Sequence, residues 1–176
     1  MHEIELLVTL KIPDVTALTA ANTMRRRLGF AERLVDLQRA DYYRLEIDAE
    51  SEQAALDQVT DLAQRTNHFV NPNKHSFAVR VATTRMTPPS RGDAYEVEVL
   101  TTDAEGDRSA DLELALANDQ ITSGRIKAVH TGVLWTLWLR AESPQEALGL
   151  ARELAVTRAR DHGLLANPHF QEVRIG

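Results

Sequence analysis

The chain has 176 residues, of which 43% are hydrophobic and 26% are charged, a composition typical of one medium-sized folded domain or two small ones. It contains no cysteine, which excludes disulfides, thiolate zinc sites and a cysteine nucleophile. The formal net charge of −6 disfavours a nucleic-acid partner. Since no apolar run is long enough to span a bilayer and no signal peptide is evident, we expect a cytoplasmic protein without a membrane partner.

The first half of the chain changes from strand to helix periodicity in a regular order. Asp14 is suited to cap a helix that stops at Gly29, and Ser51 is suited to cap a second helix that Asn71-Pro72 ends. A tight turn is expected at residues 40–41, between two short strands. The expected strands and helices occupy, in chain order, residues 4–10, 14–28, 34–39, 42–48, 51–70 and 77–81.

The linker at residues 84–94 has no apolar periodicity and contains a Pro-Pro pair, which favours an extended conformation. The second half then repeats the order of the first, with strands expected at residues 95–100, 126–130, 133–140 and 170–175. One helix is expected at residues 107–118. Another begins at Ser143, where Pro144 and Glu146 complete a capping pattern, and Gly163 is suited to end it in left-handed geometry.

The two halves also share sequence, because residues 49–56 and 141–148 are identical at six of eight positions. Asn71-Pro72 corresponds to Asn167-Pro168, but four residues out of register, so we expect the second helix of the second half to be one turn longer. We therefore predict an α+β protein, a tandem duplication of a β-α-β-β-α-β (ferredoxin-like) unit with antiparallel sheets and two helices per half. The repeats span residues 1–83 and 95–176.

The alternation of side chains along the strands predicts an interface. Tyr43, Leu45 and Ile47 correspond to Trp135, Leu137 and Leu139, and these six residues are expected to face the helices. Trp138 lies on the opposite face, and packing of this face against the other half or against another chain would bury it; the alternative is a partly exposed tryptophan with no binding role. The interface candidates on that face are Leu134, Thr136, Trp138, Tyr42 and Arg44.

Short motifs in both halves resemble PurS, the small subunit of phosphoribosylformylglycinamidine synthase, in which one chain is a single unit of about 80 residues. The first strand ends in Val-Thr-Leu-Lys at residues 8–11, and the first helix closes on Leu-Gly-Phe at residues 28–30. The family's Leu-Leu-Ala-Asn-Pro is present at residues 164–168, and a weaker form is present at residues 69–72. The family-motif residues of the two halves are Asn71, Pro72, Asn167, Pro168, Arg39 and Gly132.

Two motifs depart from the family pattern. The family's Asp-Pro-x-Gly before the first helix is reduced to Asp14, and its Arg-x-Gly-Lys turn becomes Arg39-Ala40-Asp41 in one half and His130-Thr131-Gly132 in the other. Neither half keeps the Gly-Lys pair. These changes bear on partner contacts more than on the fold.

The resemblance implies a non-catalytic assembly subunit in de novo purine biosynthesis. PurS dimers bridge a glutaminase and an ATP-using synthetase (PurQ-like and PurL-like subunits), and a tandem chain would be a covalent form of such a dimer. We therefore expect no activity of the isolated chain, no catalytic or cofactor-binding residues, and association of two chains as a homodimer. The sequence has no phosphate loop and no recognisable nucleophile arrangement.

Two other functions stay open on the sequence alone. A small-molecule-binding regulatory module would need an apolar concavity with a few polar groups between the sheets, and an enzyme of the dimeric α+β barrel type would need an enclosed pocket with perturbed titratable groups. The histidine pairs His68/His75 and His162/His169 have no second ligand at helical spacing, so we expect no metal site.

Overall fold

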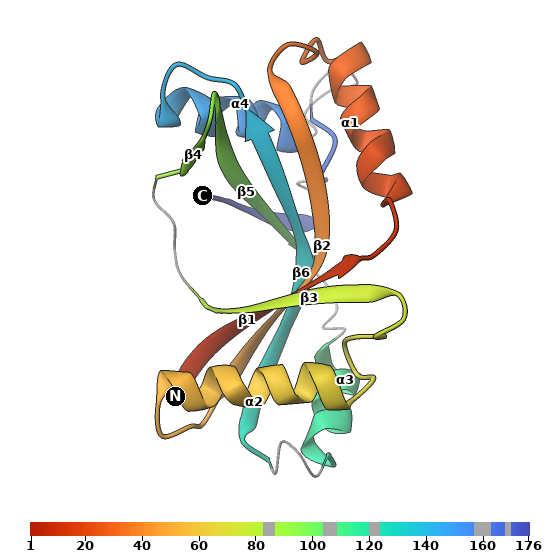
Figure 1. The fold of residues 1–176 in the computed structure, drawn as a ribbon, viewed down its shortest axis with the longest axis vertical. Helices are drawn as coiled ribbons and strands as arrows, with labels where there is room; N and C mark the ends of the chain where they lie inside the picture. Colours follow the sequence, from red (N-terminus) through yellow and green to blue (C-terminus); the bar gives the residue numbers. More distant parts are fainter. Residues whose placement is uncertain (83–86, 104–108, 120–123, 157–162, 168–169) are drawn as a thin grey trace. The chain divides into compact units, whose positions relative to one another are not determined.

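The computed structural model describes residues 1–82, 87–103, 109–119, 124–156, 163–167 and 170–176. These residues form an α+β fold with helices and an antiparallel sheet (Figure 1). The helices are α1 (Val15–Arg27), α2 (Glu52–Arg65), α3 (Ser109–Ala117) and α4 (Pro144–Ala155). The strands are β1 (His2–Leu10), β2 (Leu34–Ile47), β3 (His75–Val81), β4 (Ser90–Arg91), β5 (Ala94–Asp103), β6 (Ile126–Leu139) and β7 (Gln171–Ile175). In the part of the chain described, no helix is long and apolar enough to cross a membrane.

Strands β2 and β6 are long and continuous, so the tight turns expected near residues 40–41 and 131–132 are wrong. The strand order is β3-β1-β2-β6-β5-β4, with β7 also pairing with β5. The second part of β2 pairs with β1, from His2 opposite Ile47 to Val8 opposite Asp41. Ala40 and Asp41 thus continue a strand, because Asp41 is already paired with Val8 of β1.

The helix starts agree with the expected caps. The Asp14 carboxylate accepts hydrogen bonds from the Thr16 and Ala17 amides, at 2.8 and 3.1 Å. The Ser51 and Ser143 hydroxyls each accept from the amide three residues on, at 3.1 Å. Gly29 has a φ of +78°, the left-handed geometry expected after the end of α1. Gly163 also has a positive φ, +60°, but α4 ends at Ala155, where the Val156 backbone becomes extended, so the expectation that Gly163 ends this helix is wrong.

The ends of α2 and α4 differ from expectation. Helix α2 ends at Arg65, before Asn71, because the Thr66 backbone is extended and its hydroxyl donates back to the Leu62 carbonyl at 2.7 Å. Helix α4 ends at Ala155 and is shorter than α2, so the expected lengthened helix is wrong. The extra residues of the second half follow the helix, where 157–162 lie outside the described residues.

The chain forms two compact units, and neither is a contiguous half. Unit 1 consists of residues 1–12, 40–83 and 106–132, and unit 2 consists of residues 13–39, 84–105 and 133–176. Unit 1 therefore takes β1, α2, β3 and the second part of β2 from the first repeat, and α3 and the first part of β6 from the second. Unit 2 has the reciprocal set, with α1 and the first part of β2 coming from the first repeat.

Each unit has its own apolar core, in which two helices cover one face of the strands. In unit 1 the core joins α2 and α3 to β1, β2 and β6, and Leu45 and Ile47 are buried there, with Tyr43 packed against them. In unit 2 the core joins α1 and α4 to β2, β5 and β6. Its members include Trp135, Leu137 and Leu139, as the alternation predicted.

Candidate functional site

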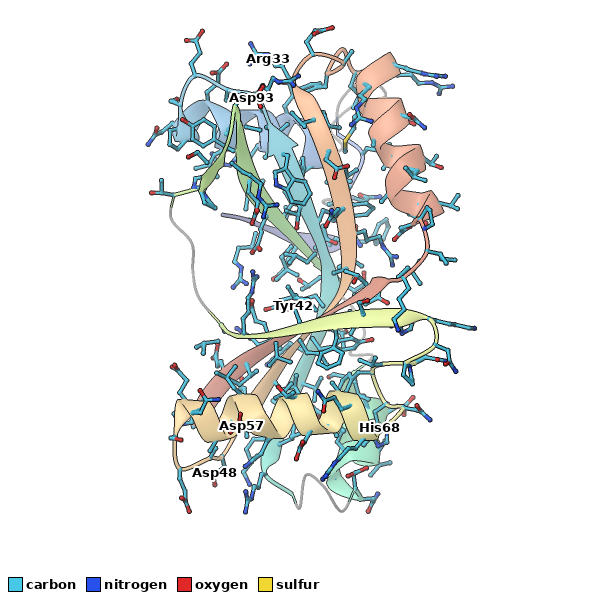
Figure 2. All side chains as sticks on the ribbon, in the orientation of Figure 1. Arg33, Tyr42, Asp48, Asp57, His68 and Asp93 are labelled. Atoms are coloured by element: carbon cyan, nitrogen blue, oxygen red, sulfur yellow. The ribbon has the colours of Figure 1, made fainter. Side chains whose placement is uncertain are left out.

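The strand face of unit 1 that points away from its helices carries a buried carboxylate. Glu5 on β1 is 1% exposed. The hydroxyl of Tyr42, labelled on β2 in Figure 2, donates to Glu5 Oε1 at 2.9 Å. Arg80 Nε on β3 donates to Glu5 Oε2 at 2.6 Å. One carboxylate thus links β1 to both of its neighbouring strands, β2 and β3, and its charge is balanced by the guanidinium.

Other polar pairs surround this triad on the same face. Arg44 on β2 lies 3.5 Å from a Glu3 carboxylate oxygen on β1. His130 Nε2 lies 3.2 Å from Glu46 Oε1, which joins β6 to β2. The side chains at positions 42, 44 and 46 therefore face the same way, as the sequence predicted, and each contacts a polar group of unit 1.

The corresponding face of unit 2 combines apolar and aromatic side chains of β6 with glutamates of β5. Leu134 and Trp138 on β6 are buried, and Trp138 is only 9% exposed. Thr136 lies between them and is half-buried. Leu134, Thr136 and Trp138 are opposite Leu100, Glu98 and Glu96 of β5, in that order. The expectation that Trp138 is covered agrees with this burial, while the partner that covers it stays a prediction.

The two repeats thus differ in chemistry at equivalent positions. Tyr42 corresponds to Leu134, Arg44 to Thr136, and Glu46 to Trp138. The first member of each pair is held in a hydrogen bond or ion pair, and the second is a smaller polar or an apolar side chain. A buried carboxylate bound by an arginine and a tyrosine is suited to fixing strand positions, since each of its two oxygens already accepts a hydrogen bond.

The asparagines of the two Asn-Pro motifs make equivalent hydrogen bonds. The backbone N–H of Asn71 donates to His75 Nδ1 at 3.2 Å, and the backbone carbonyl of Asn71 accepts from the backbone N–H of His75 at 2.8 Å. The same two bonds join Asn167 to Gln171, at 3.1 and 2.9 Å. Pro72 follows with its carbonyl bound by Lys11 at 2.7 Å, and Pro168 lies outside the described residues. These residues position the strands β3 and β7 that follow them.

The remaining family-motif residues lie on the long strands. Arg39 on β2 forms an ion pair of 3.3 Å with Asp14, the cap of α1, and so fixes that helix to the strand. Gly132 lies within β6, half-buried, in a backbone without positive φ. Arg39 belongs to unit 2 and Gly132 belongs to unit 1.

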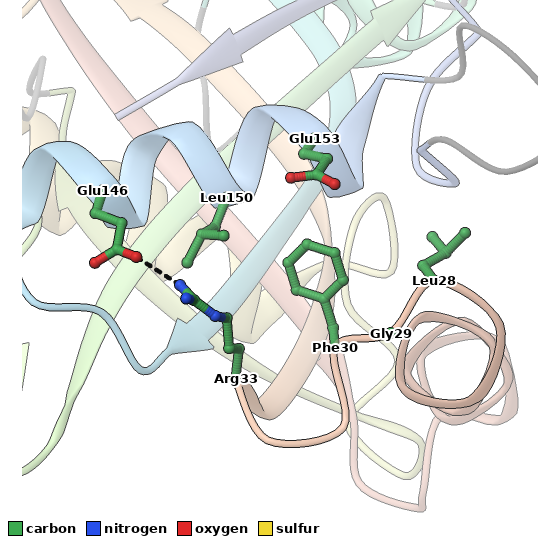
Figure 3. A pocket seen from close by; sticks show the side chains of 7 residues that line it. All are labelled: Leu28, Gly29, Phe30, Arg33, Glu146, Leu150 and Glu153. Carbon is green, nitrogen blue, oxygen red and sulfur yellow. Dashed lines mark hydrogen bonds and ion pairs between the residues drawn. The ribbon is translucent and has the colours of Figure 1, made fainter.

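A groove of about 400 Å³ opens on the surface of unit 2 between the end of α1 and α4 (Figure 3). Apolar side chains form part of its lining, and an ion pair of 2.6 Å joins Arg33 to Glu146 across it. The hydrogen bond from Arg33 lowers the pKa of Glu146, and the Glu146 carboxylate in turn raises the pKa of Arg33. The lining residues are Leu28, Gly29, Phe30, Arg33, Glu146, Leu150 and Glu153.

The sequence did not reveal the arginine contacts that organise this region. Arg25 lies in the last turn of α1 and donates to the Leu34 and Val35 carbonyls at 3.0 and 2.6 Å. Arg140 binds Asp93 at 2.6 Å, and this hydrogen bond lowers the pKa of the Asp93 carboxyl. These contacts join residues 9, 10 and 47 positions apart, so no pattern of neighbouring residues predicts them.

Two of the four histidines in the noted pairs are placed by the structure. His68 lies 3.0 Å from Asp119, and His75 accepts the Asn71 amide. His162 and His169 lie outside the described residues. Within those residues, no three histidine, aspartate or glutamate side chains are grouped to hold a metal ion.

Comparison with known proteins identifies the first repeat. Residues 3–83 match the family model described as PurS, phosphoribosylformylglycinamidine (FGAM) synthase. No curated protein matches the chain. This part of the chain is therefore PurS-like, and the match supports a role in the FGAM synthase complex of purine biosynthesis.

Proposed function

We propose that this PurS-like chain is the non-catalytic assembly subunit of an FGAM synthase complex, bridging the glutaminase and the synthetase subunits in the cytoplasm. The observation that carries the proposal is the family match over residues 3–83, which covers nearly all of the first repeat. The complex as a whole would transfer nitrogen from glutamine to formylglycinamide ribonucleotide at the expense of ATP. The contribution of this chain would be to hold the two catalytic subunits together.

The composition of the two units supports a covalent pair. Each unit needs one helix and part of a long strand from the other repeat, as two separate chains would need if they exchanged these elements. Joining the repeats in one chain removes the translational and rotational cost of pairing them. We propose that the 84–94 linker serves this purpose, with residues 1–83 and 95–176 as PurS-like repeats.

The interface part of the proposal assigns Leu134, Thr136 and Trp138 of β6 to packing within the pair, together with Tyr42 and Arg44 of β2. Burial of Trp138 and Tyr42 supports it. In addition, two such chains are proposed to associate as a homodimer. The proposal assigns no catalytic, metal or cofactor site to the chain, and the polar groups around Glu5 are given a structural role.

Reconstitution with the glutaminase and the synthetase from the same source tests the proposal. We expect the three proteins to co-elute in size-exclusion chromatography, and we expect glutamine-dependent FGAM formation to require all three. The isolated chain should neither hydrolyse glutamine nor consume ATP. Equal FGAM formation without the chain, together with no co-elution, would overturn the assembly role.

A further inference from the structure

Strand β3 forms one edge of the sheet, because it pairs with β1 and is the last strand in the order β3-β1-β2-β6-β5-β4. The two strands pair in continuous antiparallel register, from Leu10 opposite His75 to Ile4 opposite Val81. Strand β3 therefore offers seven residues of regular edge. Such an edge is a template for pairing with another polypeptide, since one side of its backbone has no neighbouring strand.

The backbone hydrogen bonds show which residues of β3 direct their polar groups outward. The N–H of Ala82, directly after β3, donates to the Glu3 carbonyl on β1 at 2.9 Å. Hydrogen-bonded and non-hydrogen-bonded pairs alternate in an antiparallel ladder, so the even-numbered residues of β3 are the ones that bond to β1. The N–H and C=O groups of Phe77, Val79 and Val81 therefore point away from β1, at the edge of the sheet.

The side chains of the same three residues are half-buried and pack against the core of unit 1. An added strand would extend this core, since its own apolar side chains would lie beside Phe77, Val79 and Val81. The residues between them, Ser76 and Ala78, are small and exposed. A strand that fits this edge thus alternates apolar residues on the helix side with polar residues on the other side.

Strand β3 lacks the devices that commonly protect an exposed edge, namely proline, a bulge, shortness or a charged side chain. It contains no proline, and its register has no bulge. Its arginine, Arg80, donates to Glu5 on β1 at 2.6 Å, so this charge is held toward the neighbouring strand and away from the edge. The equivalent strand of the second repeat, β7, is shorter, at five residues, and contains Glu172 and Arg174.

The charge of the sequence around β3 favours an acidic partner. Residues 62–92 contain five arginine or lysine residues and no aspartate or glutamate, although the whole chain has a net charge of −6. Lys74, directly before β3, is exposed. In a two-fold pairing of β3 with the same strand of a second copy, this basic stretch would meet itself, and facing like charges weaken association. Charge complementarity therefore favours an acidic strand of a different protein.

We propose that β3 binds an extended, acidic segment of a catalytic subunit of the FGAM synthase complex, which adds to the sheet as a further strand. The backbone of Phe77, Val79 and Val81 supplies the hydrogen bonds, and Lys74 faces the acidic side chains. This contact surface deepens the proposed assembly role and rests on it. Because charges contribute to the contact, binding weakens as salt concentration rises.

Residue-resolved amide hydrogen exchange tests the proposal, measured on the chain alone and with the purified synthetase or glutaminase. In the chain alone, the Phe77, Val79 and Val81 amides should exchange fast, whereas the Ala78 and Arg80 amides, which bond to β1, should exchange slowly. Binding of the catalytic subunit should slow exchange of the first set at least about tenfold and leave the second set nearly unchanged. The alternate amides of one strand thus serve as an internal control.

Substitutions test the same contact by titration with the catalytic subunit. Val79→Pro removes an outward N–H and no bond to β1, so it should weaken binding at least about tenfold. Val79→Ala keeps that N–H and should weaken binding by less than about threefold. Ile175→Pro, at the equivalent edge position of β7, is the matched control and should leave binding unchanged. Lys74→Glu should weaken binding, because it places a carboxylate beside the acidic segment.

Circular dichroism and the thermal midpoint establish that each variant is folded. The exchange measurement uses the wild-type chain, so it decides the proposal even where the Val79→Pro variant does not fold.

The outcomes distinguish the contact from the assembly role. Co-elution of the chain with the catalytic subunits, while the Phe77, Val79 and Val81 amides still exchange fast, would overturn the contact and leave the assembly role intact. Fast exchange together with no co-elution would overturn both. Protection of these amides in the chain alone that increases with its concentration would assign the edge to a second copy and reject the acidic partner. Equal weakening by Val79→Pro and Ile175→Pro would also count against β3 as the binding edge.

Discussion

Replacing Tyr42 by phenylalanine removes one donor from a buried carboxylate and keeps the ring. The Tyr42 hydroxyl lies 2.9 Å from Glu5 Oε1, and Glu5 retains its 2.6 Å bond to Arg80 Nε on the other oxygen. A hydrogen bond to a charged group contributes about 1.5–3 kcal/mol, and leaving a buried acceptor with fewer donors costs a similar amount. We therefore expect Tyr42→Phe to lower the free energy of unfolding by about 2 kcal/mol.

Urea denaturation followed by circular dichroism measures this loss. With a denaturant slope of about 2 kcal/mol/M, the unfolding midpoint should fall by about 1 M. The neighbouring Tyr43→Phe is the matched control, because Tyr43 faces the opposite side of β2, where its ring packs edge-on against Phe69 with centroids 4.7 Å apart. That ring contact survives the change, so the control should shift the midpoint by less than about 0.25 M.

The comparison of the two variants decides whether the triad stabilises unit 1. Equal midpoints for Tyr42→Phe and Tyr43→Phe would refute the reasoning, since the two changes remove the same atom from opposite faces of one strand. A loss confined to Tyr42→Phe would support a structural role for Glu5.

Further changes test other parts of the structure. Trp138→Ala should cost about 2–4 kcal/mol of unfolding free energy in urea titrations, because a buried aromatic side chain is lost, and a cost under about 1 kcal/mol would contradict its burial. The lowered pKa of Glu146 means that its pairing with Arg33 stabilises the fold at neutral pH and that this stabilisation is lost as the pH falls below about 4. Arg33→Ala should therefore lower the thermal midpoint more at pH 7 than at pH 3, and an equal change at both would contradict the assignment. Proteolytic cleavage at a site engineered into the 84–94 linker should leave both fragments eluting together in size-exclusion chromatography, because each unit contains elements of both repeats; separation without denaturant would count against that exchange.

The helix starts and the buried strand faces followed from local rules. A polar residue such as Asp14 or Ser143 before an apolar helical pattern binds amides that lie two or three positions away, so the signal and its partner occur together in the sequence. In the same way, strict alternation places Leu45 and Leu137 on the helix-facing side of their strands wherever those strands pair.

The candidate site depended on long-range contacts for a different reason. The sequence indicated that Tyr42 and Arg44 share a face, but not that Tyr42 binds Glu5, because strand pairing joins residues 37 positions apart. The Arg33–Glu146 pair, 113 positions apart, was likewise beyond the reach of any local pattern.

The repeat, the caps and the alternation can all be read from the amino-acid order, because the caps and the alternation depend on residues within a few positions of one another and the repeat is a likeness between two stretches of sequence. The continuity of β2 and β6 through the expected turns cannot be read in this way, and it is this continuity that lets each repeat supply a helix and part of a strand to both units. The physical reason is that a hairpin and a continuous strand satisfy the same alternation and nearly the same backbone hydrogen bonds. The choice between them therefore depends on which strand lies alongside, and pairing partners are set by the whole fold.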